Sequence, residues 1–218
     1  MNARETETFE FRGPAGRLEA IVNLPSGGVP PVAAAVICHA HPLHGGMMHF
    51  KVIFRAAKAL QSEGVAVLRF NFRGVGLSEG LHDHGIGEQE DARAALSEME
   101  RRFPGLPLIL GGFSFGSAMA ARVSARDPRV RAALILGFPV VRHEAAGALA
   151  EVLQPRLFVQ GGNDEFGTGA ALLDLTRDLP EPKQVVIVEG ADHFFSGRLD
   201  ELQAPIAEWA RTRPWESS

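Results

Sequence analysis

The chain has 218 residues, 45% of them hydrophobic, which suits one domain with a sizeable core spanning residues 1–218. Its net charge of −4 and its pI near 6.1 argue against a nucleic-acid partner, and no stretch reaches the ~18 apolar residues of a membrane span. Cys38 is the only cysteine, which excludes an internal disulfide framework, and Met1 to Phe11 lacks an apolar signal core, so we expect a cytoplasmic protein.

The order of apolar runs predicts an α/β fold. Two alternating segments around a Gly-Pro-Ala-Gly turn are typical of an antiparallel hairpin, and continuous apolar runs then alternate with segments of helical spacing. Strands are expected at Thr8–Phe11, Leu18–Leu24, Val32–Cys38, Val65–Phe70, Leu108–Leu110, Val130–Leu136, Arg156–Gln160 and Gln184–Glu189. Helices are expected at His49–Gln61, Ile86–Arg101, from the serine turn to Arg126, and at Glu144–Leu153, Thr168–Asp178 and Phe195–Arg211.

This pattern predicts about eight mostly parallel strands with helices on both faces of the sheet. Only about 18 residues separate Gly137 from Arg156, which leaves room for a short helix and none for a lid domain. The last residues, Thr212 to Ser218, are expected to form a loose tail.

The segment around Ser114 has the G-x-S-x-G pattern of a nucleophile elbow. The pattern places a sharp turn between a strand and a helix, where Gly112 and Gly116 avoid clashes with the strained central residue. Ser114 Oγ would stand clear of the sheet at a helix N-terminus, where free N–H groups favour an oxyanion. An ordinary turn with a capping serine fits the same pentapeptide, so a base and an acid must decide between the two interpretations.

Two residues that follow later strands supply the base and the acid. Asp164 and His193 each come just after a predicted strand, and parallel strands bring their carboxyl ends to one edge of the sheet. The order Ser114, Asp164, His193 is that of the α/β-hydrolase triad. His193 would take the serine proton, and Asp164 would accept the other imidazole N–H. Glu165 and Asp192 are weaker candidates for the acid because of their positions beside Asp164 and His193.

The two N–H groups of an oxyanion hole are expected from the elbow and from the loop His39–Gly46. Phe115, directly after the nucleophile, supplies one. In the loop, Pro42 has no N–H, and we expect the second donor to be His41, with Leu43 as the alternative. Loss of one donor would cost about 3 kcal/mol of transition-state stabilisation.

A metal site is the competing interpretation of this loop, because histidines are dense at His39, His41, His44 and His49, with His82 and His84 further along. The four loop histidines have no acidic residue among them and lack the i, i+4 spacing of helical zinc motifs. We therefore expect no metal and no other cofactor. His39 is interpreted as a residue that hydrogen-bonds to fix the loop, and His44 and His49 as structural or rim residues.

These residues predict a serine hydrolase of carboxylic esters or thioesters that acts on a small molecule through an acyl-enzyme. Without a lid, short acyl chains are favoured. An apolar acyl pocket is expected from residues that follow strands or flank the triad: Leu43, Phe115, Phe138, Phe166 and Phe194. The alternatives are a peptidase or amidase on the same triad, a metal-dependent hydrolase, and a catalytically silent hydrolase fold used for binding.

Four blocks of the sequence resemble the lidless α/β-hydrolases related to dienelactone hydrolases and small bacterial carboxylesterases. The blocks cover most of the chain in order: Cys38–Gly46 with Lys51-Val52, Arg69–Ser78, Gly112–Gly116 and Asp192–Phe195. The resemblance implies nucleophile, acid and base roles for Ser114, Asp164 and His193, and oxyanion roles for Phe115 and His41. Dienelactone hydrolases carry cysteine at the elbow, so their lactone specificity is not implied for a chain with Ser114.

Overall fold

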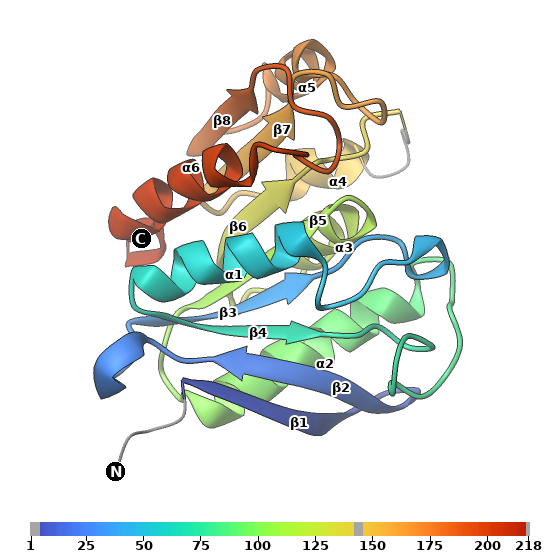
Figure 1. The fold of residues 1–218 in the computed structure, drawn as a ribbon, viewed down its shortest axis with the longest axis vertical. Coiled ribbons are helices and arrows are strands. Elements are labelled where there is room, and N and C mark those ends of the chain that lie inside the picture. The colour runs from blue at the N-terminus through green and yellow to red at the C-terminus, as the bar shows by residue number, and fades with distance from the viewer. Residues whose placement is uncertain (1–4, 142–145, 217–218) are drawn as a thin grey trace.

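The computed structural model describes residues 5–141 and 146–216, in which eight strands form a single sheet (Figure 1). The strands lie in the order β1-β2-β4-β3-β5-β6-β7-β8. β1 and β2 form the expected antiparallel hairpin, β2 also pairs antiparallel with β4, and the remaining pairs are parallel. The strand bounds are β1 Thr6–Gly13, β2 Gly16–Asn23, β3 Ala33–Cys38, β4 Val65–Phe70, β5 Leu108–Phe113, β6 Val130–Leu136, β7 Arg156–Gly161 and β8 Lys183–Val188.

Six helices cover the two faces of this sheet in the described part of the chain (Figure 1). Their bounds are α1 Lys51–Ser62, α2 Gly87–Arg102, α3 Phe115–Ser124, α4 Ala146–Glu151, α5 Gly169–Thr176 and α6 Leu199–Arg211. Because strand side chains alternate in direction, Ala35 and Ile37 of β3 pack with α1 and α6, whereas Val36 and Cys38 pack with the helices of the other face. Both apolar layers are fully buried, and the predicted α/β fold is confirmed.

The C-terminal segment departs from the prediction. Thr212–Glu216 is not a loose tail: Pro214–Glu216 forms a 3-10 turn, and Trp215 is only 2% exposed. Its ring lies 6.1 Å from that of Trp209 in α6. The free energy gained by burying the apolar surface of this indole offsets the entropic cost of ordering a few residues at the end of the chain. The position of these residues near the C-terminus did not indicate this packing.

Two helices also differ from the prediction in their bounds. α6 starts at Leu199 instead of Phe195, because Phe195 has a positive φ of 53° and belongs to the loop that holds His193. α4 spans Ala146–Glu151, and the predicted residues 144–145 lie outside the described part of the chain.

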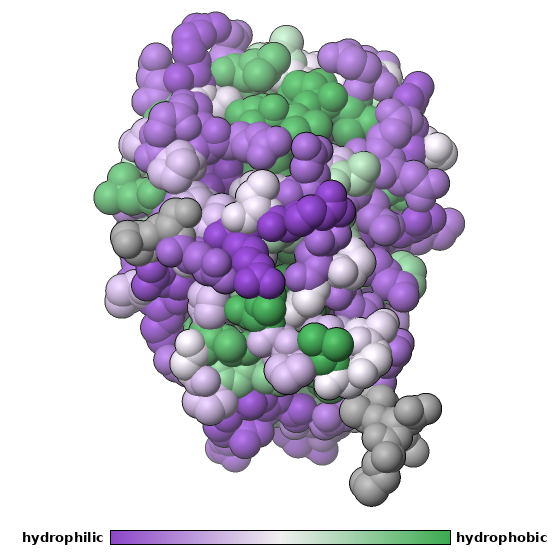
Figure 2. Space-filling model, turned by 90° about the vertical axis from the view of Figure 1, so that its left-hand side faces the viewer, coloured by the Kyte–Doolittle hydropathy of each residue, from purple (hydrophilic) through white to green (hydrophobic). Residues whose placement is uncertain are grey.

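The loops that follow the parallel strands gather at one end of the molecule, away from both chain ends (Figure 1). Between β6 and β7, the described residues carry one short helix, α4. The side with the chain ends is mostly hydrophilic, with hydrophobic side chains in separate groups (Figure 2). Among the described residues, no helix has both the length and the apolarity needed to cross a bilayer.

Candidate active site

The turn between β5 and α3 has the geometry of a nucleophile elbow. Ser114 has φ 56° and ψ −119°, a conformation that costs a residue with a side chain about 1–3 kcal/mol. A Cβ on Gly112 would lie 2.2 Å from the carbonyl oxygen of Gly116, and one on Gly116 would lie 2.3 Å from that of Cys38. The backbone segments therefore approach too closely for any residue but glycine at these two positions.

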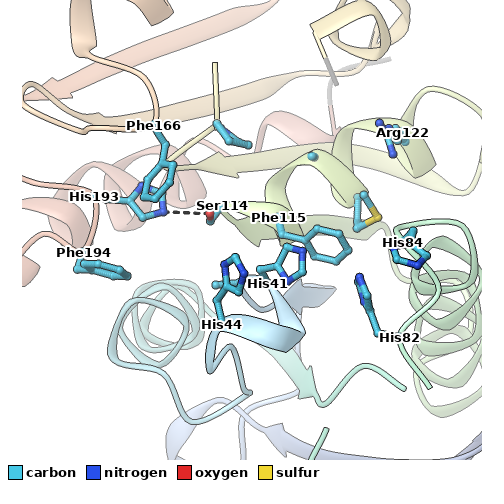
Figure 3. Close-up of a pocket in the computed structure, with 14 residues that line it drawn as sticks. His41, His44, His82, His84, Ser114, Phe115, Arg122, Phe166, His193 and Phe194 are labelled. Atoms are coloured by element: carbon cyan, nitrogen blue, oxygen red, sulfur yellow. Dashed lines mark hydrogen bonds between the residues drawn. The ribbon is translucent and has the colours of Figure 1, made fainter. Parts of the chain in front are cut away.

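The loops after β5, β7 and β8 bring Ser114, Asp164 and His193 together. His193 Nε2 lies 2.9 Å from Ser114 Oγ (Figure 3), and His193 Nδ1 lies 2.7 Å from Asp164 Oδ2. Asp164 is fully buried and His193 is 2% exposed, whereas Ser114 is half-buried and lines a cleft. With the Nδ1 proton donated to the carboxylate, Nε2 is left to accept the serine hydroxyl proton.

The two other carboxylates near this site point elsewhere. Glu165 is exposed, and Asp192 Oδ1 accepts the N–H of Ser196 at 2.8 Å. That backbone hydrogen bond is the main cause of the lowered pKa of Asp192. Asp164 Oδ1 meanwhile accepts the N–H of Phe166 at 2.8 Å, which fixes the carboxylate with its other oxygen toward His193.

Gln160 holds Asp164 in place, a role that the sequence analysis missed. Its fully buried amide donates from Nε2 to Asp164 Oδ2 at 2.9 Å and to the carbonyl oxygen of Gly167 at 2.6 Å. Its Oε1 accepts the N–H of Phe138 at 2.8 Å. Gln160 thereby joins the loops after β6 and β7 around the acid. The available signal was one amide near the end of a buried strand, directly after the apolar residues Leu157–Val159.

The expected oxyanion donors lie on neighbouring segments. Phe115 is the first residue of α3, where a backbone N–H has no intrahelical partner. The ring of His41 lies 5.0 Å from that of Phe115, so the loop after β3 runs beside the elbow. The N–H of Leu43 is engaged, because it donates to His41 Nδ1 at 3.2 Å, and this disfavours Leu43 as the second donor. The role of the His41 N–H stays a prediction.

A cleft of about 340 Å³ opens at Ser114. Phe166 and Phe194 line it beside His193 (Figure 3) and are 39% and 45% exposed. Leu43 and Phe138 do not line it. Leu43 points to solvent with 68% exposure. Phe138 is fully buried in the core that includes Leu149 of α4, and its backbone N–H donates to Gln160 Oε1.

Comparison with known proteins identifies the family. A family described as an alpha/beta hydrolase domain matches residues 33–210, which is most of the chain. The chain belongs to the α/β-hydrolase family. An uncharacterized protein of Rickettsia prowazekii is 36% identical to this α/β-hydrolase over 211 residues, which cover 93% of the chain and 87% of the relative.

Solved structures support the same assignment. A structure of an alpha-beta serine hydrolase homologue from Coxiella burnetii is 39% identical, with a TM-score of 0.86 over 93% of this chain and 96% of that one. A member of the α/β serine hydrolases without a lid, from Xanthomonas campestris, is 33% identical, with a TM-score of 0.88 over 97% and 96%. The predicted resemblance to lidless α/β-hydrolases is confirmed.

His39 fixes the loop after β3 in this α/β-hydrolase, as the sequence predicted. Its fully buried ring donates from Nδ1 to the carbonyl oxygen of Ala40 at 2.6 Å and accepts the N–H of Phe72 on Nε2 at 3.0 Å. Burial lowers the pKa of His39 to about 4. The ring is therefore neutral at pH 7, which is the state that allows both hydrogen bonds.

We expect His39 to make folding sensitive to acid. The unfolded chain protonates this imidazole near its ordinary pKa of 6.5, whereas the native protein protonates it near 4, so the unfolded state gains protons first as the pH falls. The free energy of unfolding should drop by about 3 kcal/mol between pH 7 and pH 4 from this group. Urea unfolding across this range should show a shallower pH dependence in His39→Gln. His49→Gln, an exposed control, should follow the wild type; equal slopes in all three proteins would contradict the prediction.

His82 and His84, from the loop between β4 and α2, line the end of the cleft opposite His193 (Figure 3). We call this end the far arm of the cleft. His82 Nδ1 lies 2.8 Å from Glu88 Oε1, an ion-pair distance without hydrogen-bond alignment. Burial acts to raise the pKa of Glu88, but hydrogen bonds from the backbone N–H groups of Asp83, Glu88 and Gly85 outweigh it, and the pKa is lowered. Among the described residues, no three His, Cys, Asp or Glu side chains are arranged to hold a metal ion.

Proposed function

We propose that this protein hydrolyses carboxylic esters, short-chain ones in preference, or thioesters, through an acyl-enzyme on Ser114. The observation that carries the proposal is the continuous contact from Ser114 Oγ through His193 to Asp164, at 2.9 Å and 2.7 Å. An ordinary capping serine would not need a buried histidine and a buried carboxylate aligned behind it. The proposal treats residues 1–218 as one cytoplasmic catalytic domain with a small-molecule substrate and no cofactor.

The proposed reaction has two halves. His193 Nε2 takes the proton of Ser114 as Oγ attacks the carbonyl carbon, and the N–H groups of Phe115 and His41 would stabilise the oxyanion. His193 then gives that proton to the leaving oxygen or sulfur. Water, deprotonated by His193, attacks the acyl-enzyme, and His193 returns that proton to Ser114 Oγ as the acid leaves. Asp164 keeps the Nδ1 proton in place throughout.

This sequence of steps orients the substrate in the cleft. Because His193 protonates the leaving group, that group lies on the side of Phe166 and Phe194, whose rings are 4.6 Å and 5.2 Å from the imidazole. The acyl chain then extends past Phe115 toward the opposite arm. This arm ends in polar side chains, which favours short neutral acyl chains over long ones.

The experiment is hydrolysis of p-nitrophenyl esters from acetate to decanoate, with EDTA present, by wild type and Ser114→Ala. We expect hydrolysis that depends on Ser114 and falls for the longer neutral chains. Labelling by a fluorophosphonate, lost in Ser114→Ala, separates a competent triad from a silent binding fold. Activity that survives in Ser114→Ala would sink the serine mechanism, and faster cleavage of p-nitroanilides than of matched esters would favour the amidase alternative.

A further inference from the structure

The cleft is rich in aromatic rings. Among the described residues that line it are five of the chain's eight histidines and three phenylalanines, although phenylalanine and tryptophan make up only 7% of the chain. His193, Phe166 and Phe194 lie at the end where the leaving group is expected. The other rings lie on the side expected to hold the acyl group, and we call them the aromatic wall: His41, His44, His82, His84 and Phe115.

The aromatic wall is continuous. The rings of His41 and His82 lie 5.0 Å and 5.8 Å from that of Phe115 and 4.9 Å from each other. His44 stacks on His41 at 4.5 Å, with 19° between the ring planes, and His84 meets His82 edge to face at 5.2 Å. Figure 3 shows these rings on the side of the cleft that runs from Ser114 to the far arm. The elbow and the loops after β3 and β4 therefore build one surface of flat rings.

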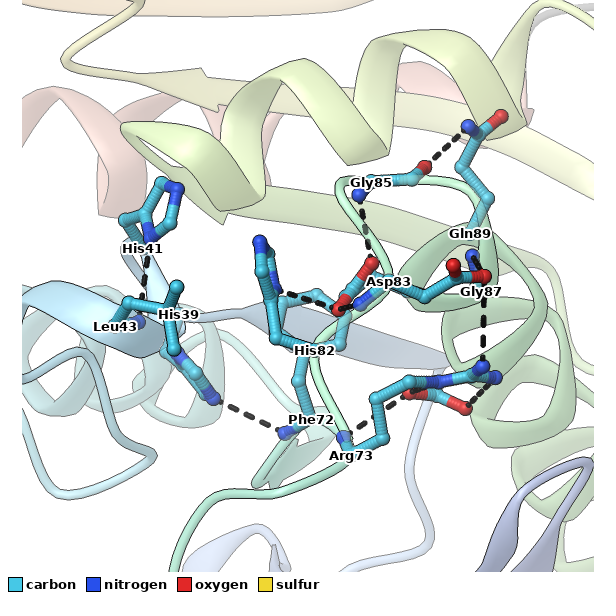
Figure 4. Close-up of polar contacts among 12 residues, drawn as sticks. His39, His41, Leu43, Phe72, Arg73, His82, Asp83, Gly85, Gly87 and Gln89 are labelled. Atoms are coloured by element: carbon cyan, nitrogen blue, oxygen red, sulfur yellow. Dashed lines mark hydrogen bonds and ion pairs between the residues drawn. The ribbon is translucent and has the colours of Figure 1, made fainter. Parts of the chain in front are cut away.

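Two rings of the aromatic wall are held at their Nδ1 atoms (Figure 4). His41 Nδ1 accepts the N–H of Leu43 at 3.2 Å, and His82 Nδ1 lies 2.8 Å from Glu88 Oε1. Glu88 also accepts the backbone N–H groups of the two residues that flank His84, both at 2.8 Å. A ligand would therefore meet rings that are already in place, and little free energy would be lost in ordering them.

Apolar atoms complete this side of the cleft. Ala118 and Met119 of α3 line it and are almost fully buried. A Cβ on Gly85 would lie 3.1 Å from Met119 Cε and 3.5 Å from Met119 Sδ, so the loop that carries His82 and His84 packs against this residue. Thioether groups make favourable contacts with aromatic rings. The acyl group would thus lie against flat rings and a thioether.

A surface of imidazole rings suits a flat aryl group better than an alkyl chain. An aryl group packs on such rings in offset or edge-to-face geometry, and this contact adds to the burial of apolar area. The nitrogen atoms at the edges of the imidazoles can then keep their contact with water. A flexible alkyl chain gains the buried area alone, and where it covers those nitrogen atoms it removes them from water without a hydrogen bond.

We propose that the aromatic wall is a subsite for an aryl ring at the end of a short acyl chain, so that the preferred substrates are esters or thioesters of arylalkanoic acids. The proposal rests on the function proposed above and narrows its acyl group. Because Phe115 directly follows Ser114, the wall begins beside the acyl carbonyl. One or two methylene groups between that carbonyl and the aryl ring are therefore enough to bring the ring onto the wall.

The test compares the ethyl esters of phenylacetic and hydrocinnamic acids with the same compounds in which cyclohexyl replaces phenyl. Neither ring is conjugated with the carbonyl, and the ethanol leaving group brings no ring of its own into the cleft. After division by the rate of alkaline hydrolysis of each ester, kcat/KM measured by pH-stat should be at least about 5-fold higher for the phenyl ester, which is about 1 kcal/mol. Apolar area alone favours the bulkier cyclohexyl group, so a ratio at or below one in both pairs would overturn the proposal.

Matched variants locate the effect. Phe115→Leu keeps the backbone N–H and removes the central ring, so the phenyl-to-cyclohexyl ratio of kcat/KM should fall below about 2. His44→Leu and His84→Leu remove the exposed end rings, and each should lower the ratio by about 2- to 3-fold. His49→Leu, at an exposed position outside the cleft lining, should leave the ratio unchanged, as should Phe166→Leu, which removes a ring on the leaving-group side.

The exposed end rings also keep the test informative if Phe115→Leu fails to fold, because His44→Leu and His84→Leu disturb no buried contact of the core. An unchanged ratio in every folded variant of the aromatic wall would contradict the proposal. A ratio that falls in Phe166→Leu and not in these variants would place the aryl ring on the leaving-group side and would contradict it as well.

A binding measurement separates this proposal from the proposed function. Calorimetry with Ser114→Ala and ethyl phenylacetate needs no turnover. If no ester is cleaved, but this ester binds more tightly than ethyl cyclohexylacetate and the difference narrows in Ser114→Ala/His44→Leu/His84→Leu, the ester hydrolase function fails and the aryl subsite stands. If esters are cleaved without any preference for the phenyl series, the function stands and the subsite is wrong.

Discussion

Ser114→Ala is expected to lower kcat for p-nitrophenyl butyrate by about 10⁵- to 10⁶-fold, and His193→Ala to lower it by a similar factor. The two side chains act as one unit, since Ser114 Oγ is a poor nucleophile until His193 Nε2, 2.9 Å away, accepts its proton. Removing both should therefore cost little more than removing either. The residual rate in all three variants would come from binding and the oxyanion donors.

The measurement is single-turnover kinetics of the two single variants and the double variant, with His49→Ala as an exposed control outside the cleft. Losses that multiply in the double variant would mean that His193 does not act through Ser114. Urea unfolding of each variant separates a loss of catalysis from a loss of folded protein.

The strands and the elbow could be predicted from the sequence because their causes are local. Apolar runs broken by glycine set the strand ends, and Gly112 and Gly116 are required by backbone contacts within a few residues or with the adjacent strand. The predicted meeting of Ser114, Asp164 and His193 rested on one further rule, that the carboxyl ends of parallel strands share an edge. The structure has them in contact through loops after β5, β7 and β8.

The lining of the cleft could not be predicted in the same way, since loop conformation depends on distant partners. Arg73 anchors the loop that carries His82 (Figure 4). Its guanidinium forms an ion pair at 2.7 Å with Asp91 of α2, which is buried. Nothing in the spacing of His82 and His84 indicates that they line the same cleft as Ser114. For the same reason the aromatic character of Phe138 did not reveal that its ring enters the core.

Asp164→Asn is expected to lower kcat by about 10³- to 10⁴-fold with a much smaller change in KM. An asparagine amide that donates to His193 Nδ1 would leave the imidazole proton on Nε2, where it blocks transfer from Ser114. The volume of the side chain hardly changes, and its remaining oxygen can still accept the N–H of Phe166. Gln160 Nε2 donates to the same Oδ2 that faces His193, so it loses that acceptor in Asp164→Asn and keeps the carbonyl oxygens of Phe138 and Gly167.

Two control variants decide which carboxylate is the acid. Glu165→Gln and Asp192→Asn remove the same charge from the adjacent positions, and each should change kcat by less than about 3-fold, because Glu165 is exposed and Asp192 is engaged by Ser196. Steady-state kinetics on p-nitrophenyl butyrate, with unfolding midpoints measured alongside, gives the comparison. A loss of activity in Glu165→Gln as large as that in Asp164→Asn would mean that the loop after β7 rearranges on substrate binding. Retention of wild-type kcat by Asp164→Asn would remove Asp164 from the triad, whatever its distance from His193.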